Sequence, residues 1–317
     1  MPELPDVTIY VEALRRSVRG QTLQRVRIAS PFVVRSVEPP VFAAEGRVLQ
    51  SVSRLGKRIV LGFDGDFYFV LHLMIAGRLR WEAPGAKAPP KLGLAVFEFE
   101  RGTLLFTEAG TKKRASLHAV QGAEALAAHA RVGRDVFALD ASAFTSELRR
   151  ENHTLKRALT DPRLFDGIGN AYGDEILHAA GLSPVALTGK LSDEAAARLH
   201  AAARRVLAAG LERLRAQFAE RFPGPGEITA FRPEFAVHGK YGQPCPVCGT
   251  NVQRIRYAEN ETNYCPRCQT GGKLLADRSL SRLLKDDWPR TIEELEDART
   301  VPPAQPPRKP ARKKRST

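Results

Sequence analysis

Residues 245–268 read CPVCGTNVQRIRYAENETNYCPRC and hold all the cysteines of the chain, Cys245, Cys248, Cys265 and Cys268. Two C-x2-C pairs separated by a hairpin-length insert can wrap four thiolates tetrahedrally around one zinc ion. A reducing cytosol disfavours disulfides, and a thioredoxin-like redox site needs only one C-x-x-C pair. The segment therefore predicts a β-hairpin organised by one structural Zn2+, with no open coordination position for a substrate.

The predicted finger is basic. Arg254 and Arg256 lie in the insert, and Arg267 and Lys273 add to its flanks. Such a hairpin can contact phosphates, or it can simply be a solvated basic surface.

The whole chain is basic, as the predicted finger is. Forty-nine Lys and Arg stand against 35 Asp and Glu, giving a formal net charge of +14 and a pI near 10.0. An excess of this size favours a nucleic-acid partner over a merely soluble basic protein.

Length and composition exclude several classes of protein. The 317 residues are 43% hydrophobic and 26% charged, as in folded soluble domains, and suffice for two modest domains. This excludes a wholly disordered chain, a fibrous repeat and a disulfide miniprotein. No apolar run approaches the ~18 residues of a membrane span, and the N-terminus lacks a secretion signal. We therefore expect a cytoplasmic, nucleoid-associated protein with no membrane partner.

The first 120 residues divide into a helix and a strand-rich region. Residues 1–19 predict a helix capped by Asp6 and ending near Gly20. Its apolar stripe has 3.6-residue spacing: Val7, Tyr10, Val11, Leu14 and Val18. Strand-like runs then follow, punctuated by Gly and Pro, at 23–28, 58–63, 67–73, 94–99 and 103–107. They predict an antiparallel sandwich or barrel.

Residues 142–220 are helix-rich and end at the breaker Phe222-Pro-Gly-Pro-Gly226. The last long helix carries Leu207, Leu211, Leu214 and Phe218 on one face. Beyond the finger we expect a short helix over 277–285 and a second helix that starts with a capping box at Thr291–Glu294. Residues 301–317 are proline-rich and basic without any acid, which predicts a disordered tail that adds nonspecific DNA affinity.

A glycine-rich turn links two predicted helices. A helix over about 145–160 precedes Gly167-Ile168-Gly169-Asn170, where the next helix starts. The glycines permit a tight turn, and the Asn170 amide together with free backbone N–H groups could hold a phosphate. A plain interhelical turn explains the same string.

The N-terminus offers a nucleophile. Removal of Met1 would expose the secondary amine of Pro2, and α-amines have pKa values near ~7.7–8.0. A neutral amine can attack an aldehydic or acetal carbon to form an iminium, with Glu3 next to it to move protons. The same residues could serve only to start a helix.

Four motifs together resemble the formamidopyrimidine-DNA glycosylase/endonuclease VIII family: Pro2-Glu3-Leu4-Pro5, Leu55-Gly56-Lys57, the Gly167–Asn170 turn and the four-cysteine finger. The resemblance covers about residues 2–272. It implies an α+β multidomain fold with a β-sandwich and leading helix (1–133), a helix–two-turn–helix domain (134–222), a lesion loop and zinc finger (223–272), and short helices with the basic tail (273–317).

The resemblance also implies chemistry. Pro2 matches the nucleophile on sugar C1′, Glu3 the residue assisting ring opening, and Lys57 a lysine contacting DNA phosphate. Asn170, with Gly169 beside it, matches the phosphate-binding position. The implied activity is a bifunctional DNA glycosylase/AP lyase acting as a monomer on damaged double-stranded DNA. The target base must leave the stack.

The sequence departs from the family pattern in three places. Asn260 stands where the finger normally has an arginine, so Arg254 and Arg256 are the candidate replacements at the phosphate. Ile75 stands at the wedge methionine and remains apolar. A basic run, Lys112, Lys113 and Arg114, replaces the segment with the second wedge.

These departures leave specificity open between two branches. Leu4 and the long loop at 222–240 favour oxidised purines such as 8-oxoguanine and formamidopyrimidines. The altered wedge fits an endonuclease VIII-like enzyme for oxidised pyrimidines. A non-catalytic zinc-finger DNA-binding protein is the rival from another class, although it would not need the Pro2-Glu3 pair.

Overall fold

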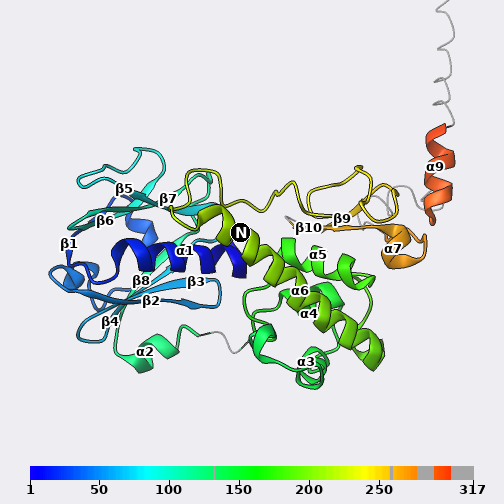
Figure 1. Ribbon diagram of the computed structural model, residues 1–317, viewed down its shortest axis with the longest axis horizontal. Helices are drawn as coiled ribbons and strands as arrows, with labels where there is room; N and C mark the ends of the chain where they lie inside the picture. The colour runs from blue at the N-terminus through cyan, green and yellow to red at the C-terminus, as the bar shows by residue number, and fades with distance from the viewer. Residues whose placement is uncertain (131–132, 258–259, 277–288, 301–317) are drawn as a thin grey trace, which may run out of the picture.

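The computed structural model describes residues 1–130, 133–257, 260–276 and 289–300 (Figure 1). The predicted helix at 277–285 and the predicted tail at 301–317 lie outside these residues. In the part of the chain that is described, no helix is long and apolar enough to cross a membrane.

The leading helix α1 (Leu4–Val18) begins three residues earlier than a cap at Asp6 would allow. Glu3 is the N-cap, and Asp6 lies in the first turn, where its carboxylate accepts the Glu3 N–H at 2.8 Å. The capping prediction for Asp6 was therefore wrong in position: Asp6 is the third residue of the helix, and its carboxylate reaches back to the N–H of the N-cap residue as in a capping box.

Eight strands form a sandwich rather than a barrel. One antiparallel sheet has the order β1-β6-β7-β5 and the other β2-β3-β4-β8. Their bounds are β1 Leu23–Ile28, β2 Leu49–Leu55, β3 Arg58–Phe63, β4 Phe67–His72, β5 Gly77–Glu82, β6 Gly93–Phe99, β7 Gly102–Glu108 and β8 Ser116–Gln121. The short helices η1 (Pro31–Val33), η2 (Val41–Ala44) and α2 (Ala123–Ala127) lie at its margins. All five predicted runs are strands; β2, β5 and β8 were not predicted.

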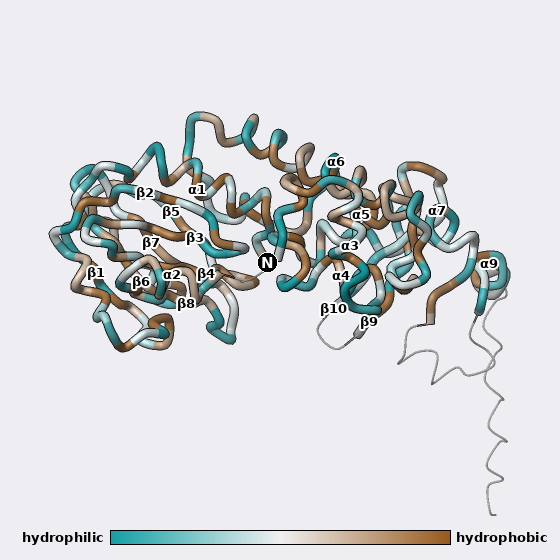
Figure 2. The backbone as a smooth tube through the Cα atoms, turned by 90° about the horizontal axis from the view of Figure 1, so that it is seen from below, coloured by the Kyte–Doolittle hydropathy of each residue, from teal (hydrophilic) through white to brown (hydrophobic). Residues whose placement is uncertain are grey.

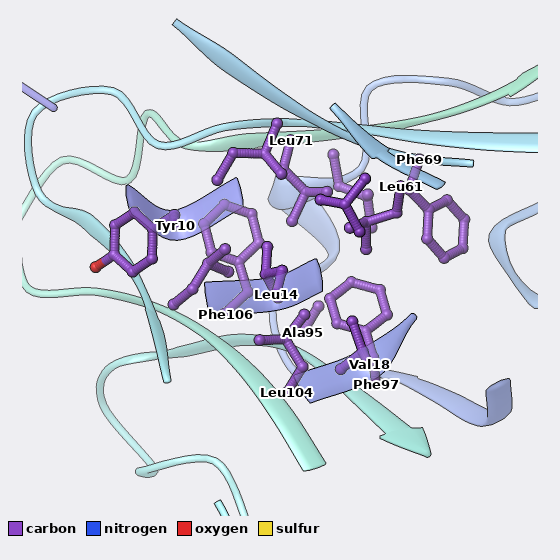
Figure 3. Packing of buried hydrophobic residues seen from close by; sticks show 14 of the residues in the cluster. Tyr10, Leu14, Val18, Leu61, Phe69, Leu71, Ala95, Phe97, Leu104 and Phe106 are labelled. Atoms are coloured by element: carbon purple, nitrogen blue, oxygen red, sulfur yellow. The ribbon is translucent and has the colours of Figure 1, made fainter. Parts of the chain in front are cut away.

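The apolar stripe of α1 fills the space between the two sheets. Tyr10, Leu14 and Val18 are buried against Phe69 of β4 and Phe106 of β7 (Figure 3). The predicted helix face is thereby confirmed. Because α1 is part of this core, the chain's first residues are held at a defined place, the junction of the two halves of the molecule (Figure 2).

The second half is helical. Its elements are η3 Val136–Ala138, α3 Ala141–Leu148, α4 Leu155–Thr160, α5 Asn170–Ala180, η4 Thr188–Lys190 and α6 Asp193–Phe218. The single helix predicted over 145–160 is two helices. Thr188 explains the break, because its hydroxyl donates to the Glu151 carbonyl and its N–H to the His153 carbonyl, so the intervening chain bonds to η4 instead of to a helical turn.

Helix α6 ties the halves together. Its 26 residues span about 39 Å. Leu199 and Leu207 belong to the core of the helical half, whereas Leu214 and Phe218 belong to the core of the sandwich. The two halves therefore share one buried element.

The C-terminal part is the predicted hairpin. Strands β9 (Gln253–Tyr257) and β10 (Asn260–Tyr264) pair antiparallel, and α7 (Pro266–Thr270) follows. Helix α9 (Ile292–Thr300) starts at the predicted capping residues, since the Thr291 hydroxyl accepts the Glu294 N–H at 3.3 Å.

Candidate active site

Glu3 joins the N-terminus to the glycine-rich turn. Its carboxylate accepts the backbone N–H groups of Gly169 at 2.7 Å, Ala171 at 2.9 Å and Tyr172 at 3.2 Å, all at the start of α5. A helix N-terminus favours an anion, and here the anion is Glu3. The backbone N–H groups of Gly169, Ala171 and Tyr172 thus have a carboxylate as their acceptor, and the phosphate expected at the Asn170 amide, beside Gly169, stays a prediction.

The two glycines of the turn are required by this contact. A Cβ on Gly169 would lie 2.5 Å from the Glu3 carboxylate, and one on Gly167 would lie 2.6 Å from Leu4. Gly167 also has a φ of +78°, a conformation that favours glycine. The turn is thus shaped to receive residues 3 and 4, and the Leu4 N–H donates to the Gly167 carbonyl at 2.9 Å.

Lys57 lies beside the same N-terminus. It is in the two-residue turn between β2 and β3, where Gly56 has a φ of +64°. Arg54, just before the turn, pairs with Asp166 of the two-turn segment at 2.5 Å and so fastens the turn to the helical half. Burial lowers the pKa of the Lys57 ammonium, and the Glu3 and Asp166 carboxylates act in the opposite direction.

A cavity of about 800 Å3 connects these groups. Met1, Lys57, Gly169 and Asn170 line it together with residues of α4 and the hairpin. Among the described residues that line it are four Lys or Arg and not one Asp or Glu: Lys57, Lys156, Arg157 and Arg256 are the basic ones. Such a surface attracts a polyanion.

A buried network behind the cavity escaped the sequence analysis. Asp174 of α5 is 1% exposed, and its two oxygens contact Lys156 Nζ at 2.6 Å and His238 Nδ1 at 2.7 Å. The Asn263 N–H of β10 donates to it at 3.1 Å. The network places the Lys156 ammonium at the cavity wall and joins α4, α5 and the finger.

Asn170 is hydrogen-bonded directly to the finger at the edge of the cavity. Its side-chain amide donates to the backbone carbonyl of Glu261 in β10 at 2.8 Å. The Glu261 carboxylate contacts Arg254 and Arg256, each at 3.2 Å, and Arg254 also stacks over the Tyr241 ring at 4.1 Å. Asn260 begins β10 opposite Tyr257, and its side chain lies outside the described residues. The arginines are thus near Asn170, and an internal carboxylate pairs with both of them.

Replacing that carboxylate is expected to tighten DNA binding. Glu261→Gln removes the negative charge between the two arginines and leaves the carbonyl that Asn170 contacts. A partly exposed pair of this kind is worth about 1 kcal/mol at most, or about fivefold in Kd. Titration of a labelled duplex over a series of salt concentrations measures both affinity and salt slope. Glu227→Gln, whose carboxylate pairs with Arg221 in another loop, is the charge-matched control. Weaker or unchanged binding by Glu261→Gln alone would contradict the interpretation.

The predicted wedge and basic run lie on loops of the sandwich. Ile75, between β4 and β5, is 57% exposed, as a wedge side chain must be. In the loop after β7, Lys112 and Arg114 are exposed, whereas the Lys113 ammonium bonds to the Glu108 carbonyl. The buried Glu108 carboxylate accepts the N–H of Arg114 and so shapes this loop.

The four cysteines form one metal site. Their sulfurs lie within 4.8 Å of one another, with Cys248–Cys265 at 3.4 Å and Cys245–Cys268 at 3.9 Å. Four thiolates about 2.3 Å from a tetrahedral zinc ion are about 3.8 Å apart, so the arrangement fits one structural Zn2+. His178 Nε2 is 3.3 Å from Cys245 Sγ, which puts α5 against the metal site.

Comparison with known proteins agrees with this architecture. Residues 1–114 match the formamidopyrimidine-DNA glycosylase N-terminal domain, 133–219 its H2TH domain, and 242–271 the zinc finger found in FPG and IleRS. The fold and the site together are those of a DNA-repair glycosylase.

Curated relatives extend the match along the chain. The formamidopyrimidine-DNA glycosylase of Heliobacterium modesticaldum is 32% identical over 85% of this chain and 100% of its own length. That of Moorella thermoacetica is 33% identical over 81% and 95%. A Lactococcus lactis FPG variant, in complex with DNA containing Fapy-dG, superposes with a TM-score of 0.76 at 25% identity over 85% of this chain and 100% of its own. This chain belongs to the formamidopyrimidine-DNA glycosylase family. It is an enzyme, a DNA glycosylase, of a family to which AP lyase activity also belongs.

Proposed function

We propose that the enzyme removes oxidised bases through a Schiff base at Pro2 and then nicks the strand. The observation that carries this proposal is the position of the N-terminus: Met1 lines a basic cavity together with Lys57 and Asn170, and Glu3 is bonded to the backbone N–H of Gly169 at the same cavity. Damaged double-stranded DNA is the partner: its phosphates meet Lys57 and the Asn170 side chain, and the everted nucleotide reaches Pro2.

The first step forms one bond and breaks one bond. After removal of Met1, the lone pair of the Pro2 nitrogen attacks C1′, and the bond from C1′ to the base breaks as the base leaves with a proton. The N–H proton of Pro2 is the one that leaves with the base; opening of the sugar ring then gives an iminium and a 4′-hydroxyl, whose proton comes from water and is passed on by the Glu3 carboxylate. Burial lowers the pKa of the Met1 α-amino group at this place, and Glu3 opposes that effect. Burial of a Pro2 amine at this place would act in the same direction and favour the neutral, nucleophilic form.

Elimination then cleaves the strand. Loss of a C2′ proton expels the 3′ phosphate, and a second elimination expels the 5′ phosphate; water finally hydrolyses the imine. Lys57 and Arg256 supply positive charge at the cavity wall for these leaving groups.

Oxidised purines are the proposed substrates, with 8-oxoguanine and formamidopyrimidines as the main examples. The support is the name of the curated relatives and the DNA in the neighbouring structures, which contains carbocyclic 8-oxo-G or Fapy-dG. Single-turnover excision from matched duplexes tests this choice. Much faster removal of 5-hydroxycytosine or thymine glycol would assign the enzyme to oxidised pyrimidines instead.

We further propose that the enzyme acts as a monomer on chromosomal DNA in the cytoplasm. One lesion needs one nucleophile, and one chain supplies it through Pro2. Sedimentation of the enzyme with and without a lesion duplex measures the stoichiometry, and a 2:1 complex would contradict a monomer.

Borohydride trapping tests the chemistry. Reduction of the iminium by borohydride should give a covalent enzyme–DNA adduct with an abasic-site duplex and none with the undamaged duplex. Peptide mass spectrometry should locate the adduct at Pro2. A folded, DNA-binding sample that gives no adduct would instead be the non-catalytic binding protein.

A further inference from the structure

The loop between α6 and the finger sends one charged side chain into the protein beneath the N-terminus. Arg232 is 7% exposed, and its guanidinium contacts Asp6 Oδ1 at 2.5 Å. Asp6 is itself 3% exposed. The partners are 226 positions apart in the sequence, so this ion pair exists only in the folded protein.

Asp6 connects this ion pair to the Pro2–Glu3 segment through a hydrogen bond. While Oδ1 faces Arg232, Oδ2 accepts the backbone N–H of Glu3 at 2.8 Å. Burial raises the pKa of Asp6, and Arg232 counteracts that effect, as an opposite charge should. The Glu3 N–H therefore has its acceptor because Arg232 holds the Asp6 carboxyl group in place.

The same loop has an exposed side beside this buried residue. Phe231 is 73% exposed, and its ring lies nearly parallel to that of His238, with centroids 6.2 Å apart and planes at 21°. The far end of the loop is fixed to α5, where Glu175 accepts the N–H groups of Ala236 and His238. Residues 231–238 thus run from the N-terminus of α1 to α5, with Phe231 open to solvent.

We propose that Arg232 is a positioning residue for the nucleophile: acting through Asp6, it holds the Pro2–Glu3 segment, so that docking of the 231–238 loop and placement of the Pro2 amine occur together. This inference rests on the proposed role of Pro2. A displacement of the nucleophile by even about 1 Å can cost about a hundredfold in rate. Docking of the loop then controls the rate of attack by Pro2, whereas DNA affinity depends on the basic cavity.

Removal of the ion pair tests the proposal. Arg232→Met is expected to slow single-turnover borohydride trapping at saturating abasic-site DNA by about tenfold or more, with Kd within about twofold of wild type. Arg232→Lys, which keeps the charge, should recover part of the rate. Arg221→Met is the matched control, because Arg221 lies near the start of the same connection and its pair with Glu227 is exposed. It should trap at the wild-type rate.

A double variant covers the case in which Arg232→Met misfolds because a buried carboxylate is left unpaired. Asp6→Asn keeps an oxygen that can accept the Glu3 N–H, so Asp6→Asn with Arg232→Met leaves no stranded charge. It should fold, bind DNA and still trap slowly. The inference would be overturned if the double variant trapped at the wild-type rate. It would also be overturned if Arg221→Met lost as much of the trapping rate as Arg232→Met. Absence of any adduct with the wild-type enzyme would instead refute the proposed function.

Discussion

Blocking the Pro2 amine is expected to abolish adduct formation and strand cleavage while leaving DNA binding intact. A lysine inserted between Met1 and Pro2 prevents removal of Met1 and turns the Pro2 nitrogen into an amide, which has no lone pair for attack. Loss of the nucleophile should lower the single-turnover rate by at least about 10³-fold. Quenched-flow cleavage of a lesion duplex measures the rate, and a filter-binding titration measures the affinity.

The control variant carries the added lysine after Thr317 instead, so that removal of Met1 still leaves Pro2 at the N-terminus. It should retain the wild-type rate, and intact-mass measurement should show its Met1 removed. Full activity in a preparation whose chains all keep Met1 would refute the mechanism through a Pro2 imine, because the Pro2 nitrogen is then an amide without a lone pair for attack.

Loss of the zinc ion is expected to unfold the finger and weaken binding of lesion DNA. Cys265 is fully buried, and Cys265→Ser removes one of the four thiolates of the metal site. In isolated zinc fingers, the free energy of zinc binding is about 10–16 kcal/mol and drives folding. Strand β10 would then release Glu261 from Asn170 and Asn263 from Asp174. We expect metal content near zero and affinity for a lesion duplex lower by at least about tenfold.

Val247→Ser is the matched control for the finger. Val247 lies between two of the metal ligands yet is 74% exposed, so its replacement should preserve both metal content and affinity. Normal affinity of the metal-free Cys265→Ser protein would mean that the finger does not contribute to lesion binding.

Three of the four edge strands of the sandwich show why part of the fold could not be predicted. Strands β2, β5 and β8 lie at sheet edges. Strand β2 has a register shift, and its burial pattern has only two fully buried positions, Leu49 and Val52. Central strands such as β3 are buried on both faces and therefore carry continuous apolar runs, which a sequence pattern detects. Edge strands carry a weaker signal because half of their pairing and much of their surface remain open.

The amino-acid sequence alone determined the local features of this protein. The cysteine spacing predicted the metal hairpin, the stripe from Val7 to Val18 predicted the buried face of α1, and the order of short motifs predicted the family. Each of these depends on residues that are close in the chain or on motifs that are recognisable by themselves.

Tertiary structure decided how the site is assembled. Glu3 reaches the amides of α5 across about 166 to 169 positions, and Arg232 reaches Asp6 across 226. The sequence around a charged residue does not show which distant residue will pair with it. The free-energy cost of burying the charge is offset only after folding has brought the two residues together. For that reason neither the Glu3 carboxylate at the backbone N–H of Gly169 nor the Asp174 network could be predicted from the sequence, and both were found only in the folded chain.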